Sequence, residues 1–267
     1  MRCPSFQISG SKQQQLPLFY SFGGFVWDAC GIGDSAERDA GWQARLFLLH
    51  LPHMVITWYG QACFKIQSGD LVIAVDPFGK DIGFTPPRFR ADIVAVTHGH
   101  HDHNNSAAIA GDPFLITGPG EYEVKGVNIT GIETYHDTVK GRERGLNTIY
   151  MIEAEGIRIL HMGDFGEEKM REETLEAAGE TDILMIPVGG VYTIEGDAAA
   201  KIARQIEPAI VIPMHYKIPG LKVPLQGQEQ FLKEMSAKDI EPQEKLTIKK
   251  KDIPEDGKMA VMMLKQA

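Results

Sequence analysis

The stretch Thr97-His98-Gly99-His100-His101-Asp102-His103 places four histidines and one aspartate, all potential metal ligands, within six residues, directly after the apolar run 93–97. That run is rich in β-branched residues and predicts a buried strand. At a turn after a strand, imidazoles at alternate positions can converge on one cation while the next carboxylate and imidazole face a second. Neutral imidazole and carboxylate groups bind Zn²⁺, and also Mn²⁺ or Fe²⁺. The stretch therefore predicts a metal site at the end of a strand.

Strand-like segments dominate on both sides of this stretch. We expect a hairpin over 54–67 that turns at Gly60-Gln61, and further strands at 71–75, 93–97, 128–132, 147–152, 157–160, 182–186 and 209–212. Helical patterns cover 167–178, 197–206 and about 228–237, and short strands at 246–248 and 259–264 follow them. Many early strands followed by strand–helix alternation predict an α/β fold of two sheets with helices outside.

Composition and charge exclude several classes of function. The 267 residues carry 27 Lys and Arg against 36 Asp and Glu, a net charge of −9, which disfavours a nucleic-acid-binding surface. No apolar run approaches the roughly twenty residues that cross a bilayer. Three cysteines indicate no disulfide framework and favour a reducing compartment, so we expect a cytoplasmic protein. We also expect a small-molecule substrate. No pattern specifies an oligomeric state.

Residues 1–53 differ from the rest of the chain. They contain four basic and four acidic residues and show no sustained period. The apolar stretch 16–27 follows two basic residues, as in a secretory signal, but no Ala-x-Ala cleavage site comes after it. We expect residues 1–53 to be an extension, either weakly structured or preceding the true start at Met54, and the domain to cover 54–267.

The pattern His98-x-His100-x-Asp102-His103 resembles the H-x-H-x-D-H signature of the metallo-β-lactamase fold superfamily. The resemblance covers nearly all of residues 54 to about 264. It is strongest to the branch that contains L-ascorbate 6-phosphate lactonase and N-acyl phosphatidylethanolamine phospholipase D. It implies a four-layer αβ/βα sandwich with two metal ions at the edge where the sheets meet.

Three further family motifs follow in the expected order. His136 looks like the third histidine of the first site, Asp164 looks like the carboxylate that bridges both metals, and His215 looks like the histidine of the second site. The resemblance thus implies His98, His100 and His136 on one metal, Asp102, His103 and His215 on the other, and Asp164 between them.

Other polar residues near these motifs are candidates for supporting roles. Asp76 matches the acidic residue that opens the family pattern and would orient a ligand, although an Asp before Pro77 can also simply cap a turn. His161 would either orient a neighbour or donate a proton to the leaving group. Tyr216 or Tyr192 would stabilise an oxyanion or pack in the core, and His101 is expected to point away from the metals.

The implied chemistry is hydrolysis. Two divalent cations, with zinc the first choice and manganese or iron the alternatives, would activate a hydroxide. The hydroxide attacks an ester, lactone or phosphodiester of a small or phosphorylated substrate, and Asp102 accepts the proton of this nucleophile. One alternative is a nuclease of the same superfamily, which the acidic total and the short 164–215 interval disfavour. The other alternative is a metal-stabilised binding protein without turnover.

Specificity is expected to reside in loops around the site. The candidates are 78–90 and 140–146, which carry arginines that either bind an anionic group or are solvated: Arg88, Arg90, Arg142 and Arg144. The glycine-rich stretch 187–193 follows a predicted strand, and its glycines would let the backbone approach the site.

Overall fold

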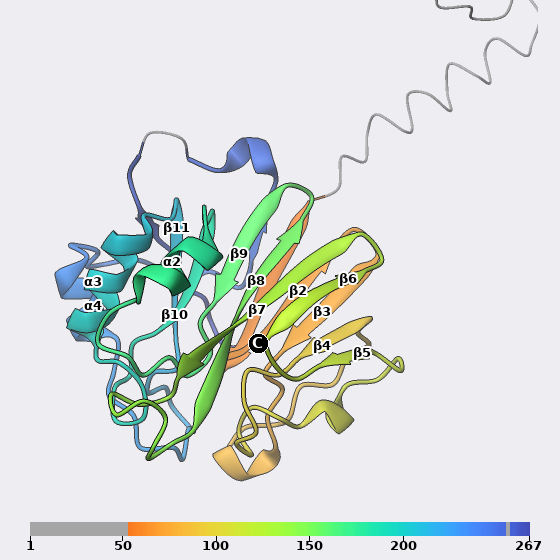
Figure 1. Cartoon of the computed structure of the whole chain (residues 1–267), viewed down its shortest axis with the longest axis horizontal. Helices are drawn as coiled ribbons and strands as arrows, with labels where there is room; N and C mark the ends of the chain where they lie inside the picture. Colours follow the sequence, from red (N-terminus) through yellow and green to blue (C-terminus); the bar gives the residue numbers. More distant parts are fainter. Residues whose placement is uncertain (1–52, 255–256) are drawn as a thin grey trace, which may run out of the picture. The chain divides into compact units, whose positions relative to one another are not determined.

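The computed structural model of the chain describes residues 53–254 and 257–267. The predicted extension over residues 1–53 therefore lies outside the described residues, except for His53. Within the described part, two β-sheets pack face to face, with their strands running in similar directions (Figure 1).

The first sheet has six strands and the second has seven. The order in the first is β12 (Leu246–Ile248), β1 (Met54–Gly60), β2 (Cys63–Ser68), β3 (Leu71–Val75), β4 (Ile93–Ala95), β5 (Phe114–Ile116). The order in the second is β13 (Ala260–Val261), β11 (Ile210–Met214), β10 (Ile183–Pro187), β9 (Ile157–His161), β8 (Leu146–Ala154), β7 (Val127–Tyr135), β6 (Gly120–Val124).

The burial pattern of the strands explains how they pack. In β1, every second residue is buried, so Met54, Ile56 and Trp58 face the other sheet. In β10 and β11, every residue is buried because these parallel strands are covered on both faces. The side chains between the two sheets form one continuous apolar core.

The helices cover the second sheet. The helix α3 (Gly196–Ile206) packs on β10 and against α4 (Glu229–Glu234), and α2 (Glu172–Ala178) contacts β7. The outer face of the first sheet is covered by a smaller cluster that includes Phe89 and Ile109, next to the 3-10 turn η2 (Ser106–Ala108). Another such turn, η1 (Lys80–Ile82), contributes Ile82 to a separate apolar cluster with Phe78. A third such turn, η3 (Lys250–Asp252), follows β12. The predicted α/β sandwich is confirmed.

Several elements differ from the prediction in extent or were not predicted. The helix predicted over 167–178 begins only at Glu172, because the Glu167 carboxylate instead accepts the Tyr135 backbone N–H at 3.1 Å and holds a loop against the end of β7. The last predicted strand shortens to Ala260–Val261. The short strands β5 and β6 were not predicted as separate elements; both lie at sheet edges, where burial is incomplete and the alternation of apolar residues is weak.

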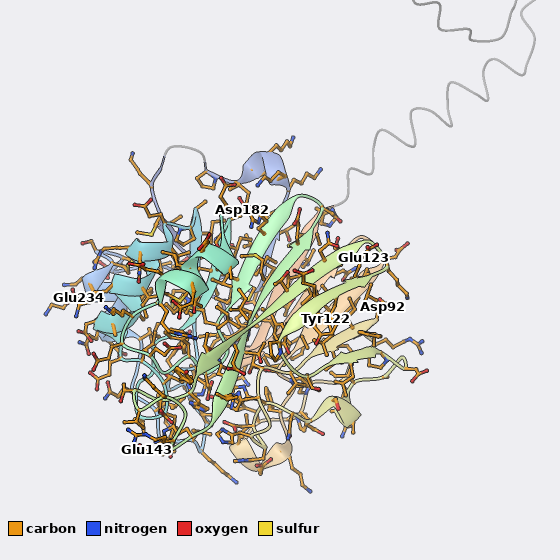
Figure 2. The ribbon with its side chains drawn as sticks, viewed as in Figure 1. Asp92, Tyr122, Glu123, Glu143, Asp182 and Glu234 are labelled. Atoms are coloured by element: carbon orange, nitrogen blue, oxygen red, sulfur yellow. The ribbon has the colours of Figure 1, made fainter. Side chains whose placement is uncertain are left out.

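No helix in the described ranges is both long and apolar enough to span a membrane. The two ends of the second sheet are marked in Figure 2 by Asp182, which precedes β10, and by Glu143, in the loop after β7. The predicted ligands gather at the end marked by Glu143.

Candidate metal centre

Four strand ends meet at this edge of the sandwich. The strands β7, β9, β10 and β11 all run in the same direction, so their carboxyl ends lie together. His136 follows β7 directly, Asp164 comes three residues after β9, and His215 follows β11 directly. The loop after β4 in the first sheet supplies 98–103 from the opposite side.

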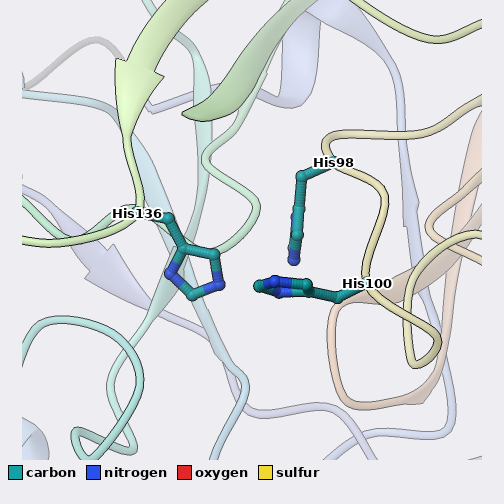
Figure 3. A group of neighbouring side chains, drawn as sticks. All are labelled: His98, His100 and His136. Atoms are coloured by element: carbon teal, nitrogen blue, oxygen red, sulfur yellow. The ribbon is translucent and has the colours of Figure 1, made fainter. Parts of the chain in front are cut away.

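The first group of side chains consists of three histidines. Figure 3 shows His98, His100 and His136 turned toward one another, and ring atoms of all three lie within 4.8 Å of each other. The ring centroids are 4.6 Å apart for His98 and His100, and 4.7 Å apart for His98 and His136. Three imidazoles converging from two loops can hold one divalent cation.

The second group is Asp102, His103 and His215, whose ligand atoms also lie within 4.8 Å of one another. Asp164 stands between the two groups. Its Oδ2 is 3.3 Å from His136 Nε2, in the first group, and its Oδ1 is 3.2 Å from His215 Nε2, in the second. One carboxylate therefore presents a different oxygen to each group.

Three polar atoms at the centre of this cluster lack hydrogen bonds. His98 Nε2, His103 Nε2 and Asp164 Oδ1 are buried and have no hydrogen-bond partner in the structure. An unpaired buried polar atom costs about 1–3 kcal/mol, so three together require an explanation. Imidazole nitrogens and carboxylate oxygens are ligands of divalent cations. The three unpaired atoms are of these two kinds, so this donor set fits a divalent cation.

The protonation states of His98, His100 and Asp164 agree with this donor set. Burial, reinforced by neighbouring histidines, lowers the pKa of His98 and of His100 below the ordinary imidazole value. Burial alone would raise the pKa of Asp164, but the imidazoles of His103 and His215 outweigh it and hold that pKa well below its usual range. Neutral imidazole and ionised carboxylate are the forms that bind metals.

Asp76 is positioned to orient one of these side chains. It is fully buried, and its Oδ2 lies 2.9 Å from His103 Nδ1, while its two oxygens accept the Thr97 hydroxyl and backbone N–H at 2.7 and 2.8 Å. Burial lowers the pKa of His103, but the carboxylates of Asp164 and Asp76 outweigh this and raise the pKa well above the ordinary imidazole value. Asp76 has a φ of 46°, a strained backbone state that these bonds maintain.

The other predicted supporting residues lie further from the cluster. His161 is fully buried: its Nε2 pairs with the Ala62 carbonyl at 2.9 Å and its Nδ1 with the Gly163 N–H at 3.1 Å. Neither nitrogen is free to reach a substrate, so its geometry favours the orienting alternative. Tyr216 packs against Trp58 in the core, with ring centroids 5.1 Å apart. His101 points to the surface and pairs with Asp81 at 3.0 Å.

A cavity of about 450 Å³ opens over the cluster. Its wall includes His100, His136, Asp102 and Asp164, together with two cationic side chains, Arg144 and Lys222. The Arg144 guanidinium lies over the Tyr192 ring, 4.6 Å from its centroid, and donates to the Val191 carbonyl at 3.4 Å. The other predicted arginines lie elsewhere, since Arg88 and Arg90 line a separate hollow and Arg142 is exposed.

Sequence patterns did not identify the residues that hold the loops of the site. Asp137 accepts the backbone N–H groups of residues 139, 141, 143 and 144 at 2.7–2.9 Å, which fixes the loop that carries Arg144. Asn147 Oδ1 accepts the Asp164 N–H at 3.0 Å, and its amide nitrogen donates to the Met162 carbonyl at 3.0 Å. Gln61 contacts both Asp102 and His215. The partners of Gln61 and Asn147 are distant in the sequence, and those of Asp137 are backbone groups, so none of these roles leaves a residue pattern.

The glycine-rich stretch does let the backbone approach the site. A Cβ atom on Gly189 would lie 2.2 Å from the His215 carbonyl oxygen, so only glycine fits there. The following turn places Val191 at a φ of 60°, an uncommon state for a β-branched residue, and presents Tyr192 to the cavity.

The chain is similar to proteins of the beta-lactamase superfamily and to proteins described as metal-dependent hydrolases. A family description of the beta-lactamase superfamily domain matches residues 55–215. A UPF0173 metal-dependent hydrolase of Thermoplasma acidophilum is 33% identical over 193 residues, 62% of this chain and 84% of that protein. Another, from Thermococcus onnurineus, is 29% identical over 188 residues, 60% of this chain and 84% of the relative.

A solved structure from Thermotoga maritima is similar to the described part of the chain. It is a proposed zinc-dependent hydrolase of the metallo-β-lactamase superfamily, and it matches with a TM-score of 0.65 and 35% identity. The match covers 79% of this chain and 100% of that one.

Proposed function

Because the chain belongs to the beta-lactamase superfamily, we propose that it is a metal-dependent hydrolase that acts on a small anionic ester, lactone or phosphodiester. The observation that carries this proposal is the placement of Asp164, whose two oxygens face two separate groups of ligand atoms. Relatives described as metal-dependent hydrolases support the reaction class.

The residues would divide between two cations. The first would be held by His98, His100 and His136, the second by Asp102, His103 and His215, and Asp164 would contact both. Zinc suits these donors best, and manganese or iron are the alternatives. When bound, such a pair lowers the pKa of a water molecule and polarises the electrophilic oxygen of the substrate.

The protein's own side chains have separate tasks around that chemistry. The Asp102 carboxylate lies in the cavity wall, where it would orient the attacking water and accept its proton. The Tyr192 hydroxyl would donate a hydrogen bond to the developing oxyanion. Asp76 and Asn147 hold His103 and the Asp164 backbone in place.

The cavity supports a substrate of limited size that carries negative charge. A volume of about 450 Å³ falls within the usual range for small-molecule sites. Neither Arg144 nor Lys222 has a carboxylate partner among the described residues, although the cavity wall contains three acidic side chains. Because the Arg144 and Lys222 side chains have no carboxylate partner, they favour a substrate that carries a phosphate or carboxylate group.

The test is metal analysis of the full chain followed by a screen of lactones, esters and phosphodiesters. We expect about two metal ions per chain, and we expect Asp164→Ala to lose both the second ion and turnover. Asp70→Ala, in an exposed turn, serves as the control. Wild-type turnover by Asp164→Ala on every substrate would overturn the mechanism, and salt-sensitive cleavage of single-stranded RNA with no activity on small esters would favour the nuclease alternative.

A further inference from the structure

Gln61 lies at the base of the cluster, in the turn between β1 and β2. Its side chain is fully buried, and its backbone has a φ of 54°. The Gln61 carbonyl oxygen accepts two hydrogen bonds, from the Trp58 indole nitrogen at 2.9 Å and from the His215 backbone N–H at 3.0 Å. The first sheet therefore holds this residue rigidly against the end of β11 in the second sheet.

The side chain of Gln61 reaches two of the predicted ligands. Its amide nitrogen lies 2.9 Å from His215 Nε2 and 3.0 Å from Asp102 Oδ2. These are the atoms that would face the second cation, since His215 Nε2 also lies 3.2 Å from Asp164 Oδ1. The amide oxygen of Gln61, in contrast, is buried and has no hydrogen-bond partner.

This arrangement is inconsistent with a metal on the same atoms. A nitrogen lone pair that accepts an amide N–H cannot also bind a cation. A rotation of 180° about the Cγ–Cδ bond would exchange the amide oxygen and nitrogen while leaving the other atoms in place. The oxygen would then take the position next to Asp102 and His215.

We propose that Gln61 is an additional ligand of the second cation and supplies its amide oxygen to the site formed by Asp102, His103, His215 and Asp164. This inference rests on the proposed function, because it requires a cation at that position. It gives the two sites different donor sets. The site of His98, His100 and His136 has three nitrogens and one Asp164 oxygen, whereas the second has two nitrogens and three oxygens.

The difference in donors has a consequence for metal preference. Oxygen ligands favour manganese and other hard cations, while imidazole suits zinc and iron. We therefore expect the second site to accept Mn²⁺ more readily than the first, and to lose that preference without the Gln61 oxygen.

The test compares metal binding by the full chain with binding by Gln61→Leu and Gln61→Glu, with Zn²⁺ and Mn²⁺ titrated into metal-free protein. Leucine approximates the size of the side chain without an oxygen, whereas glutamate keeps an oxygen ligand but cannot donate N–H at neutral pH. We expect two ions per chain in the wild type and in Gln61→Glu. In Gln61→Leu, we expect at least tenfold weaker binding of the second ion.

The control is Gln67→Leu, which removes an amide on β2 that donates to the Gly69 carbonyl at 3.2 Å. Thermal unfolding of the metal-free proteins establishes that each variant folds. Equal binding of both ions by Gln61→Leu and the wild type would overturn the inference alone. Loss of the second ion in Gln61→Glu would also overturn it, because the amide would then act only as a donor. Absence of metal binding by the wild type would overturn the proposed function as well.

Discussion

His103 Nδ1 lies 2.9 Å from Oδ2 of Asp76, and both side chains are fully buried. An ionised carboxylate can only accept a hydrogen bond, so the contact places the proton of His103 on Nδ1. In the neutral imidazole, which is the form that binds a metal, Nε2 is then left with a lone pair toward the cluster. Asp76 thereby fixes both the orientation and the tautomer that metal binding requires.

Asp76→Asn tests this relationship. Asparagine keeps one oxygen, which the Thr97 backbone N–H still needs, so its NH₂ group would face His103 Nδ1. His103 would have to accept that bond and carry its proton on Nε2. We expect affinity for the second ion to fall about 10–100-fold, measured by metal titration. Asp70→Asn is the exposed control, and unchanged binding in Asp76→Asn would contradict the assigned tautomer.

The sequence predicted the parts of the site whose pattern is local. Residues 98–103 contain four histidines and one aspartate in one turn, and such a concentration of ligand types rarely serves only packing. His136, Asp164 and His215 required the family resemblance, since a single histidine after a strand is usually structural. The structure brings all seven side chains into one cluster.

Gln61 and Asp137 could not be predicted in this way. The contact of Gln61 with His215 joins residues 154 positions apart, across two different sheets. Asp137 acts through four backbone N–H groups of its own loop, and backbone partners carry no residue signature. The fold was more accessible because buried strands such as β10 and β11 appear as continuous apolar runs.

Asp92 predicts a pH dependence of stability far from the metal cluster. It directly precedes β4, an inner strand of the first sheet (Figure 2), and it accepts hydrogen bonds from Lys125 at 2.5 Å and from the Val72 N–H at 2.9 Å. The Lys125 bond, followed by the Val72 bond, lowers the pKa of Asp92 below its ordinary value of 3.8. Because the folded pKa is the lower one, the stabilisation is present above the unfolded value and is lost as the pH falls through the folded value.

Asp92→Asn should therefore lower the free energy of unfolding by about 1 kcal/mol near neutral pH. The difference from the wild type should narrow below about pH 4, as the wild-type carboxylate becomes protonated. Urea unfolding of both proteins between about pH 7 and about pH 3 measures it. A difference that stayed constant across this range would show that charge on Asp92 contributes nothing.

Asp137→Ala should loosen the loop over 138–145. Removing the carboxylate leaves the four N–H groups to water, and the free energy of unfolding should fall by about 1–3 kcal/mol. Hydrogen exchange at the amides of Val139, Gly141 and Arg144 should accelerate. Glu143→Ala removes an exposed carboxylate from the same loop but keeps its backbone N–H, so its exchange rates should match the wild type. Unchanged protection in Asp137→Ala would mean that other contacts hold the loop.

Arg144 is expected to recognise the anionic group of the substrate. It lies in the cavity wall against Tyr192 and makes no ion pair among the described residues. A charge-assisted hydrogen bond contributes about 1.5–3 kcal/mol, so Arg144→Ala should raise KM for a phosphorylated lactone at least about tenfold and change kcat little. Arg142→Ala is the matched control, because Arg142 occupies the same loop but is exposed and bonds to the Val139 carbonyl. A neutral lactone should show no difference between the two variants. An equal rise in KM for charged and neutral lactones in Arg144→Ala would indicate that the arginine shapes the cavity and does not bind the anion.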